Sequence, residues 1–201
     1  MRISILGAGN VGSTLAAGLT KCGHDVVLGV RDPKKRPAAE GKLLSVKDAV
    51  QAADVIVLAV PWNSVPDAIK SAGDLTGKIV LDATNPLLPD LSGLDTPPGK
   101  SGGERVAELA RVPVVKIFNT TGFQNMANPV YNGQAATMFY CGDDANAKSI
   151  AATLATDLGF EPIDAGPLKQ ASVLEPFALL WISLAHQQGL GANIAFKLMR
   201  R

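Results

Sequence analysis

A glycine-rich segment near the start of the chain is of the type that holds the phosphates of a dinucleotide. It reads Gly7-Ala8-Gly9-Asn10-Val11-Gly12, follows a short apolar run, and opens a segment whose apolar residues recur at helical spacing. In such a loop Gly7 permits the tight turn, Gly9 lets the backbone approach the pyrophosphate, and Gly12 lets the helix pack closely on the sheet. The helix N-terminus then offers free N–H groups and partial positive charge to the phosphates. The motif and its strand-to-helix position together predict a dinucleotide site.

Arg31 is the residue expected to select the dinucleotide. An NAD site usually has an acidic side chain about twenty residues past the loop, where it accepts hydrogen bonds from the ribose hydroxyls. Arg31 occupies about that place, and its guanidinium can form a charge-assisted, bidentate pair with the 2′-phosphate of NADP. Lys34, Lys35 and Arg36 add positive charge nearby. We therefore predict NADP(H), with NAD(H) as the alternative if Asp32 faces the ribose instead.

Three loops are expected to meet at the nicotinamide end, because a doubly wound sheet binds its ligand at the carboxyl ends of the strands. They cover residues 60–64, 83–86 and 118–122 and offer amides and hydroxyls but almost no titratable groups. Reduction of a carbonyl usually needs a proton donor near the substrate oxygen, whereas hydride transfer between two redox cofactors mainly needs alignment of two rings. We therefore predict no catalytic acid or base. His186 is the candidate if one is needed, and His24 is expected to be structural.

Strand-like and helix-like patterns alternate along almost the whole chain. Apolar patterns typical of strands cover residues 3–6, 26–28, 42–44, 55–60, 78–81, 112–117, 136–140 and 160–163. Two of the helical patterns between them open with capping boxes, at Ser45 and Ser101. This alternation predicts an α/β fold of the Rossmann type, with a doubly wound, mostly parallel sheet and a small C-terminal α/β extension. We expect residues 1–201 to form a single NADP-binding domain, with a dinucleotide-binding core at 1–127 and an extension at 128–201 that completes the acceptor site.

Composition and charge exclude several classes of partner. The chain has 201 residues, a formal net charge of +1 and 47% hydrophobic residues. The hydrophobic fraction is typical of a chain with a folded core. The net charge is too small to give the positive electrostatic field that would attract nucleic acid or an anionic membrane. The N-terminal apolar run is too short for a signal peptide, and the apolar stretch at 173–185 is too short to cross a bilayer, so a cytoplasmic protein is expected. Cys22 and Cys141 are expected to be reduced packing residues, and no cluster suggests a metal.

Five motifs, in this order along the chain, resemble those of one known family. They are Ile3-Ser4-Ile5-Leu6-Gly7-Ala8-Gly9-Asn10-Val11-Gly12, Gly29-Val30-Arg31, Ala59-Val60-Pro61-Trp62, Asp82-Ala83-Thr84-Asn85-Pro86 and Lys116-Ile117-Phe118-Asn119-Thr120. The sequence resembles the NADP oxidoreductases that depend on coenzyme F420, a deazaflavin, over nearly its whole length. The closing segment, 174–198, is similar to a bacterial branch of predicted dinucleotide-binding enzymes. The reductase domains of membrane ferric reductases share the same motifs.

The resemblance implies direct hydride exchange between NADP(H) and a deazaflavin, or a flavin such as FMN or FAD, stacked on the nicotinamide. Matching of motifs assigns three groups of residues. The pyrophosphate would be lined by Gly9, Asn10 and Val11, the 2′-phosphate held by Arg31 and Lys35, and the nicotinamide and its partner ring surrounded by Val60, Pro61, Asn85 and Asn119. The family often has Ser or Thr before the arginine. Here Val30 stands there, which predicts a weaker preference for NADP.

Two other functions stay open at this point. The first is an NADPH-dependent reductase of a small imine or carbonyl compound, in which His186 or a tyrosine would supply the proton. The second is a sensor that binds the dinucleotide without oxidising it. The apolar closing helix, with Trp181 in its stripe, predicts either core packing or the contact surface of a homodimer.

Overall fold

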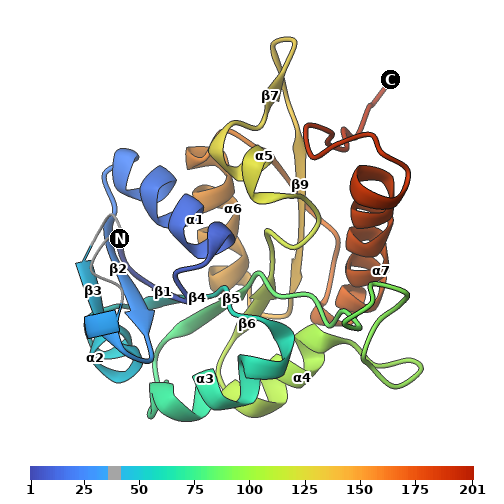
Figure 1. Cartoon of the computed structure of the whole chain (residues 1–201). Helices are drawn as coiled ribbons and strands as arrows, with labels where there is room; N and C mark the ends of the chain where they lie inside the picture. Colours follow the sequence, from blue (N-terminus) through green and yellow to red (C-terminus); the bar gives the residue numbers. More distant parts are fainter. Residues whose placement is uncertain (36–41) are drawn as a thin grey trace.

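An eight-stranded sheet forms the centre of the molecule (Figure 1). The computed structural model describes residues 1–35 and 42–201. The strand order is β10-β9-β6-β5-β4-β1-β2-β3. In chain order these strands are β1 (Arg2–Leu6), β2 (Asp25–Val30), β3 (Lys42–Ser45), β4 (Val55–Leu58), β5 (Ile79–Asp82), β6 (Val114–Lys116), β9 (Thr137–Gly142) and β10 (Glu161–Asp164). Each strand expected from the sequence is present, with ends that differ by a few residues.

The sheet is parallel from β3 to β6 and reverses direction once. Strand β9 pairs antiparallel with β6 and parallel with β10. Strand β1 lies between β2 and β4, so the chain moves outward from β1 first to one side of the sheet and then to the other. Ligands of doubly wound sheets bind beside the carboxyl ends of the strands at such a switch point. The predicted fold class is confirmed, and the glycine-rich loop follows the strand at the switch point.

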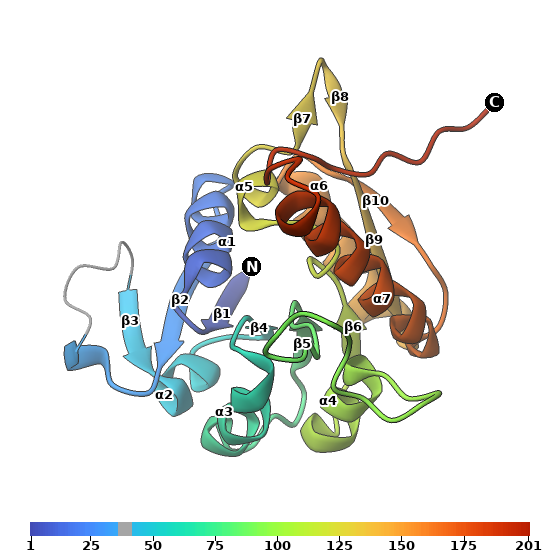
Figure 2. The same ribbon diagram turned by 45° about the vertical axis from the view of Figure 1, so that its right-hand side comes forward.

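Helices cover both faces of the sheet (Figures 1 and 2). Helices α1 (Asn10–Lys21), α5 (Phe123–Ala127) and α6 (Ala145–Asp157) lie on one face. Helices α2 (Val46–Gln51), α3 (Val65–Ala72) and α4 (Gly102–Ala110) lie on the other. A separate buried apolar cluster fills the space under each layer. Short helical turns cover Pro33–Lys35, Trp62–Ser64, Leu168–Gln170 and Ser183–Gln187.

The C-terminal part of the chain adds helix α7 (Ala171–Ile182) and a small hairpin, β7 (Val130–Tyr131) and β8 (Gln134–Ala135). Helix α7 buries one apolar stripe that includes Trp181, whose indole Nε1 donates to the carbonyl of Ile194 at 2.8 Å. The core alternative for this stripe is therefore confirmed. No helix of the described residues is long and apolar enough to cross a membrane.

The two predicted helix starts and the two cysteines can be compared with the structure directly. Ser45 Oγ accepts from the N–H of Asp48 at 3.2 Å. Ser101 forms a complete capping box with Glu104, in which each side chain accepts from the other residue's N–H. Both cysteines are free; Cys141 is buried, as expected, but Cys22 is exposed rather than packed in the core because it follows the last turn of α1.

Ser4 is a buried hydroxyl without a hydrogen-bond partner among the described residues. It lies in β1, is 0% exposed, and its Oγ has no acceptor or donor in range. An unpaired buried polar group costs about 1–3 kcal/mol. We expect Ser4→Ala to leave the free energy of unfolding unchanged or to raise it by about 1 kcal/mol, which is roughly 2–4 °C in Tm for a chain of this size. Thermal and urea unfolding measure this, and a loss of stability would show that the hydroxyl binds a buried water.

Candidate dinucleotide site

The glycine loop is held tightly at its two ends and is open in its middle. Gly7 has φ +112°, and a Cβ there would lie 2.3 Å from the carbonyl oxygen of Ala59. A Cβ at Gly12 would lie 2.0 Å from the carbonyl oxygen of Gly7. A Cβ at Gly9, in contrast, would meet nothing within 4 Å. The outer two glycines are therefore needed by the fold, whereas the middle glycine keeps space free outside the backbone.

The first turn of α1 is arranged to receive an anion. Gly9 is the N-cap residue, no side chain caps the helix, and no acidic residue lies in its first turn. Asn10 and Val11 begin the helix, so their N–H groups belong to those that an α-helix leaves without an internal partner. Free N–H groups and the helix dipole favour a phosphate at this end.

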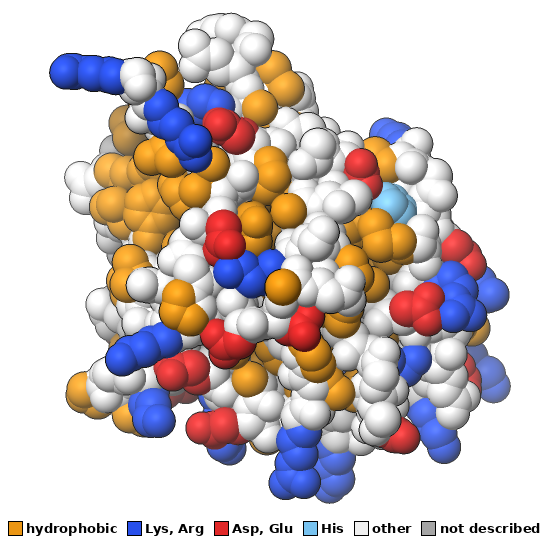
Figure 3. Space-filling view, turned by 180° about the vertical axis from the view of Figure 1, so that it is seen from behind, with side chains coloured by type: hydrophobic (Ala, Val, Ile, Leu, Met, Phe, Trp, Pro, Cys, Tyr) orange, Lys and Arg blue, Asp and Glu red, His pale blue; other side chains and the backbone are white. Residues whose placement is uncertain are grey.

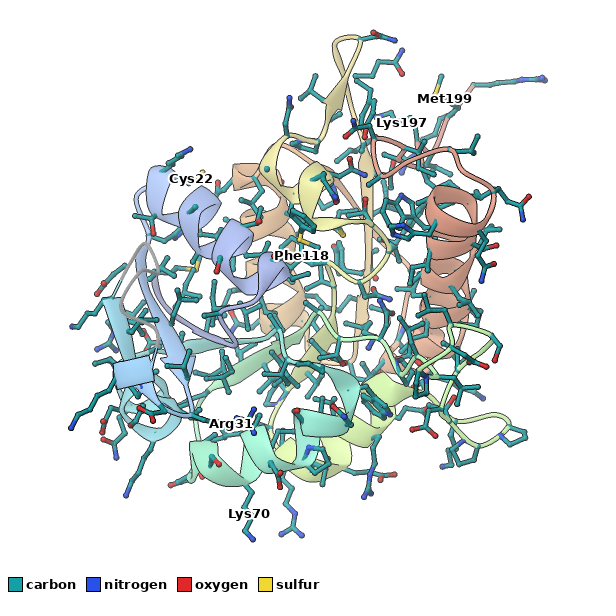
Figure 4. The ribbon with its side chains drawn as sticks, in the orientation of Figure 1. Cys22, Arg31, Lys70, Phe118, Lys197 and Met199 are labelled. Carbon is teal, nitrogen blue, oxygen red and sulfur yellow. The ribbon has the colours of Figure 1, made fainter. Side chains whose placement is uncertain are left out.

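A cavity of about 560 Å³ opens directly beside this loop. It is bounded by the loop, the end of β2, the segment after β4 and one side of α3. The structure brings five of the predicted site residues to its wall, namely Gly7, Gly9, Arg31, Val60 and Pro61. Figure 4 shows Arg31 between the end of β2 and α3, and the residue lines this cavity.

Asp32 also lines the cavity, but its carboxylate is engaged in the turn that follows. Its Oδ1 accepts from the N–H of Lys34 at 3.1 Å. Arg31 is the cationic side chain among the described residues of this wall. The backbone of Lys35 lies in the turn Pro33–Lys35, but its side chain, like the whole of Arg36, is outside the described part of the chain.

Asn85 and Asn119 lie together, beyond this cavity, on the loops after β5 and β6. Asn85 Nδ2 donates to the carbonyl of Asn119 at 2.8 Å, and Asn119 Nδ2 donates to Asn85 Oδ1 at 3.1 Å. Asn119 Nδ2 also lies 3.3 Å from the carbonyl oxygen of Leu174 in α7. Asn119 Oδ1 is buried and has no partner among the described residues. The pair joins two loops at the carboxyl edge of the sheet and leaves one acceptor unused.

Phe118 sets the direction of the second of these loops. It has φ +64°, a region that bulky residues rarely adopt, and it is 1% exposed. Its ring packs into the core cluster that contains Met126 of α5, as Figure 4 shows in the centre of the molecule. Strained backbone of this type persists where packing enforces it and is concentrated at functional sites. Here it turns the chain immediately before Asn119.

A buried group of three charged residues lies beneath these loops, and sequence reasoning gave it no role. We refer to Lys116, Asp82 and Glu175 as the Lys116 cluster; all three are 0% exposed. Lys116 Nζ lies 2.8 Å from Asp82 Oδ2, 2.9 Å from Glu175 Oε1 and 2.8 Å from the carbonyl oxygen of Thr84. Burial lowers the pKa of Lys116, but the two carboxylates outweigh it and raise the pKa above its usual value. The sequence signal for this cluster is a single charged residue within each of two apolar segments, Lys116 in 112–117 and Glu175 in 173–185.

Comparisons with known proteins identify the family. Residues 2–86 match the sequence model of the NADP oxidoreductases dependent on coenzyme F420. A solved structure of a putative F420-dependent NADP reductase from Arthrobacter sp. FB24 is 34% identical, covers 100% of both chains and superposes with a TM-score of 0.90. The chain belongs to the coenzyme F420-dependent NADP oxidoreductase family. It is accordingly an NADP-dependent oxidoreductase.

Two curated relatives extend the comparison. The F420-dependent NADP reductase of Methanothermobacter thermautotrophicus is 28% identical over 211 residues, which cover 92% of this chain and 89% of the relative. Metalloreductase STEAP3 of Rattus norvegicus is 31% identical over 182 residues, which cover 89% of this chain but only 36% of that protein. This member of the F420-dependent family therefore spans about a third of the length of the metalloreductase.

Neither histidine of this family member lines the cavity beside the glycine loop, and Cys141 is buried. His24 bonds Asp157 at 2.9 Å and the N-terminal amine at 3.2 Å, which fits the structural role expected of it. Burial raises the pKa of Cys141 to about 12, so its thiol stays protonated. His186 is exposed, and its ring lies nearly perpendicular to the Trp181 ring, with the centroids 6.2 Å apart. The described residues contain no group of three or more His, Cys, Asp or Glu side chains that could hold a metal.

Proposed function

We propose that this protein transfers a hydride between NADP(H) and a deazaflavin, coenzyme F420, or a flavin placed against the nicotinamide. The observation that carries the proposal is the chemistry of the loops after β4, β5 and β6. They offer amides and hydroxyls, and the ionisable residues below them are buried and bonded to one another. A site of this composition suits two rings held face to face better than a substrate that must be protonated.

The residues of the chain fit a dinucleotide at the cavity beside the glycine loop. The space outside Gly9 is free for a pyrophosphate, and the first turn of α1 lacks an acidic side chain that would repel it. Arg31 lines the same cavity, where it would pair with the 2′-phosphate. Val60 and Pro61 also line the cavity, and the Asn85–Asn119 pair lies on the loops after the next two strands of the sheet. A bound nicotinamide dinucleotide supplies the hydride, and these residues bind and orient it.

The test is oxidation of NADPH by the purified protein with coenzyme F420, FMN and FAD in parallel, and with NADH as the control donor. We expect rapid turnover with one of these acceptors and a preference for NADPH. Tight binding of NADPH without turnover on any of them would contradict the proposal. In that case a small imine or carbonyl substrate, or a sensor role, would account better for the site.

We further propose that residues 128–201 complete the acceptor site and that the outer face of α7 joins two copies of the chain. Of the seven exposed large hydrophobic residues among those described, five lie between 173 and 199, namely Val173, Leu180, Leu190, Leu198 and Met199. Figure 3 shows a field of hydrophobic side chains on this side of the molecule, below the extended C-terminal end. Patches of this type mark contact surfaces.

Leu180→Glu tests the homodimer. Leu180 is 48% exposed on α7, so a charge there is tolerated by the monomer but not by an apolar interface. We expect the wild type to sediment as a dimer at micromolar concentration and the variant as a folded monomer. A monomeric wild-type protein would show that α7 is not a homodimer surface.

A further inference from the structure

We infer that the Lys116 cluster positions the loops that bear Asn85 and Asn119, and that Glu175 fixes α7 against these loops of the hydride-transfer site. The inference rests on the proposed function and adds positioning residues to it. No residue of the cluster reaches the cavity wall, so none of them is assigned a direct role in catalysis. The argument depends on how completely the cluster is bonded and on which segments it joins.

All hydrogen-bonding positions of the Lys116 ammonium are used. Its three N–H groups have three acceptors within 2.9 Å, which come from Asp82, Thr84 and Glu175. The other oxygen of Asp82 accepts from both the N–H and the hydroxyl of Thr84, at 2.9 and 2.7 Å. A buried network that is fully satisfied is rigid, because any displacement leaves a charged group without a partner. The segment from Asp82 to Thr84, which leads directly into Asn85, is therefore fixed to β6.

Glu175 connects the same ammonium to a different part of the chain. Its Oε2 accepts from the N–H of Gly102 and its Oε1 from the N–H of Gly103, both at 2.9 Å. These are the first two residues of α4, whose N-terminal partial charge offsets the excess negative charge of the cluster. One carboxylate thus bonds α4 and β6 to α7 at once.

The two glycines at the start of α4 allow α7 to come this close. A Cβ at Gly103 would lie 2.9 Å from the Cβ of Ala171, and one at Gly102 would lie 3.0 Å from Glu175 Oε1. The approach also brings the carbonyl oxygen of Leu174, the neighbour of Glu175, within 3.3 Å of Asn119 Nδ2. The position of α7 therefore determines one of the hydrogen bonds that orient the Asn119 amide.

Glu175→Gln is the sharpest variant, because it changes charge and bonding while it keeps the shape. Three donors now share the two carboxylate oxygens of Glu175, namely Lys116 Nζ and the N–H groups of Gly102 and Gly103. An amide has one oxygen, and its NH₂ group would have to face one of these donors. At least one of the three contacts must break. Glu175→Asp is the second variant; it keeps the charge but is one methylene too short to reach all three donors.

Glu104→Gln is the matched control. Glu104 also lies at the start of α4, where its Oε2 accepts from the N–H and hydroxyl of Ser101, but it has no contact with Lys116. The substitution makes the same chemical change at the same helix end. It should therefore report the effect of weakening α4 alone.

The experiment compares three measurements in the wild type and the variants. Single-turnover NADPH oxidation with the acceptor that works best is expected to slow roughly 10- to 100-fold in Glu175→Gln and Glu175→Asp, since small displacements of positioning groups have effects of this size. The Kd for NADPH should stay within about twofold, because the adenine end of the site is remote from the cluster. Hydrogen exchange should speed up in peptides covering 83–88 and 117–123, but not in α1. Glu104→Gln should match the wild type in all three.

The outcomes separate this inference from the proposed function. Failure of the wild-type protein to oxidise NADPH with any of the acceptors would contradict the proposed function. Faster hydrogen exchange in the two loops of the Glu175 variants would still support positioning by the Lys116 cluster. Unchanged exchange and an unchanged transfer rate in both Glu175 variants would overturn the inference. Slowing of equal size in Glu104→Gln would also overturn it, since the cluster would then act only through the stability of α4.

Discussion

A Gly9→Val variant is expected to fold like the wild type and to lose measurable binding of both NADPH and NADH. Gly9 has φ −82° and ψ −170°, an extended conformation that valine adopts without strain. A Cβ there meets no atom of the protein within 4 Å. The added side chain would instead occupy the space through which a pyrophosphate reaches the first N–H groups of α1. The loss therefore falls on the ligand and not on the fold.

Gly12→Ala is the contrasting variant that makes this prediction specific. Its Cβ would lie 2.0 Å from the carbonyl oxygen of Gly7, so the loop and helix must move apart, and we expect a clear fall in Tm. Fluorescence titration with NADPH and NADH, together with thermal unfolding, measures both effects. A Gly9→Val protein with a normal Tm and normal affinity would show that the pyrophosphate does not approach the loop at this residue.

The features that can be recognised in the sequence depend on short-range patterns. The glycine loop and Arg31 are recognisable because motif spacing and the strand-to-helix transition are encoded within about thirty residues. Both reach one cavity in the structure. The alternation of elements predicted the doubly wound sheet for the same reason. The reversal at β9 was not predicted, because apolar periodicity does not report the direction of a strand.

The features that were missed depend on contacts between residues distant in the chain. Asn85 and Asn119 were each expected near the nicotinamide, but the hydrogen bonds between them were not predicted. These bonds join two loops whose residues are 34 positions apart in the chain. Glu175 was read as part of an apolar helix, although a lone carboxylate beside a proline on such a helix needs a buried partner. Lys116 is that partner, and it stands in an equally apolar strand. An isolated charged residue in an apolar segment is the sequence signal for a buried ion pair. The sequence does not say which two such residues pair, because that depends on the fold.

Arg31→Ala is expected to weaken NADPH binding far more than NADH binding. Loss of a charge-assisted contact to a phosphate costs about 1.5–3 kcal/mol, which corresponds to a roughly 10- to 150-fold rise in Kd for NADPH. NADH has no 2′-phosphate, so its Kd should change by no more than about twofold. Arg31 lies at the cavity wall, is exposed, and follows β2 directly, so its truncation should leave the core intact.

Lys34→Ala and Asp32→Ala show whether the effect of Arg31 is specific. Lys34 is an exposed cation of the same turn, and its removal tests whether general positive charge is sufficient; a small effect that disappears at high salt is expected. Asp32 Oδ1 accepts from the N–H of Lys34, so the Asp32→Ala substitution should loosen the turn. The affinities for NADPH and NADH should then fall to a similar, small extent. A selective loss of NADH binding in Asp32→Ala would instead place that carboxylate on the ribose.

Equal losses of affinity for NADPH and NADH in Arg31→Ala would show that Arg31 does not bind the 2′-phosphate. Because Val30 offers no hydroxyl to the phosphate, the selectivity of the wild type should depend almost entirely on the single guanidinium of Arg31 among the described residues.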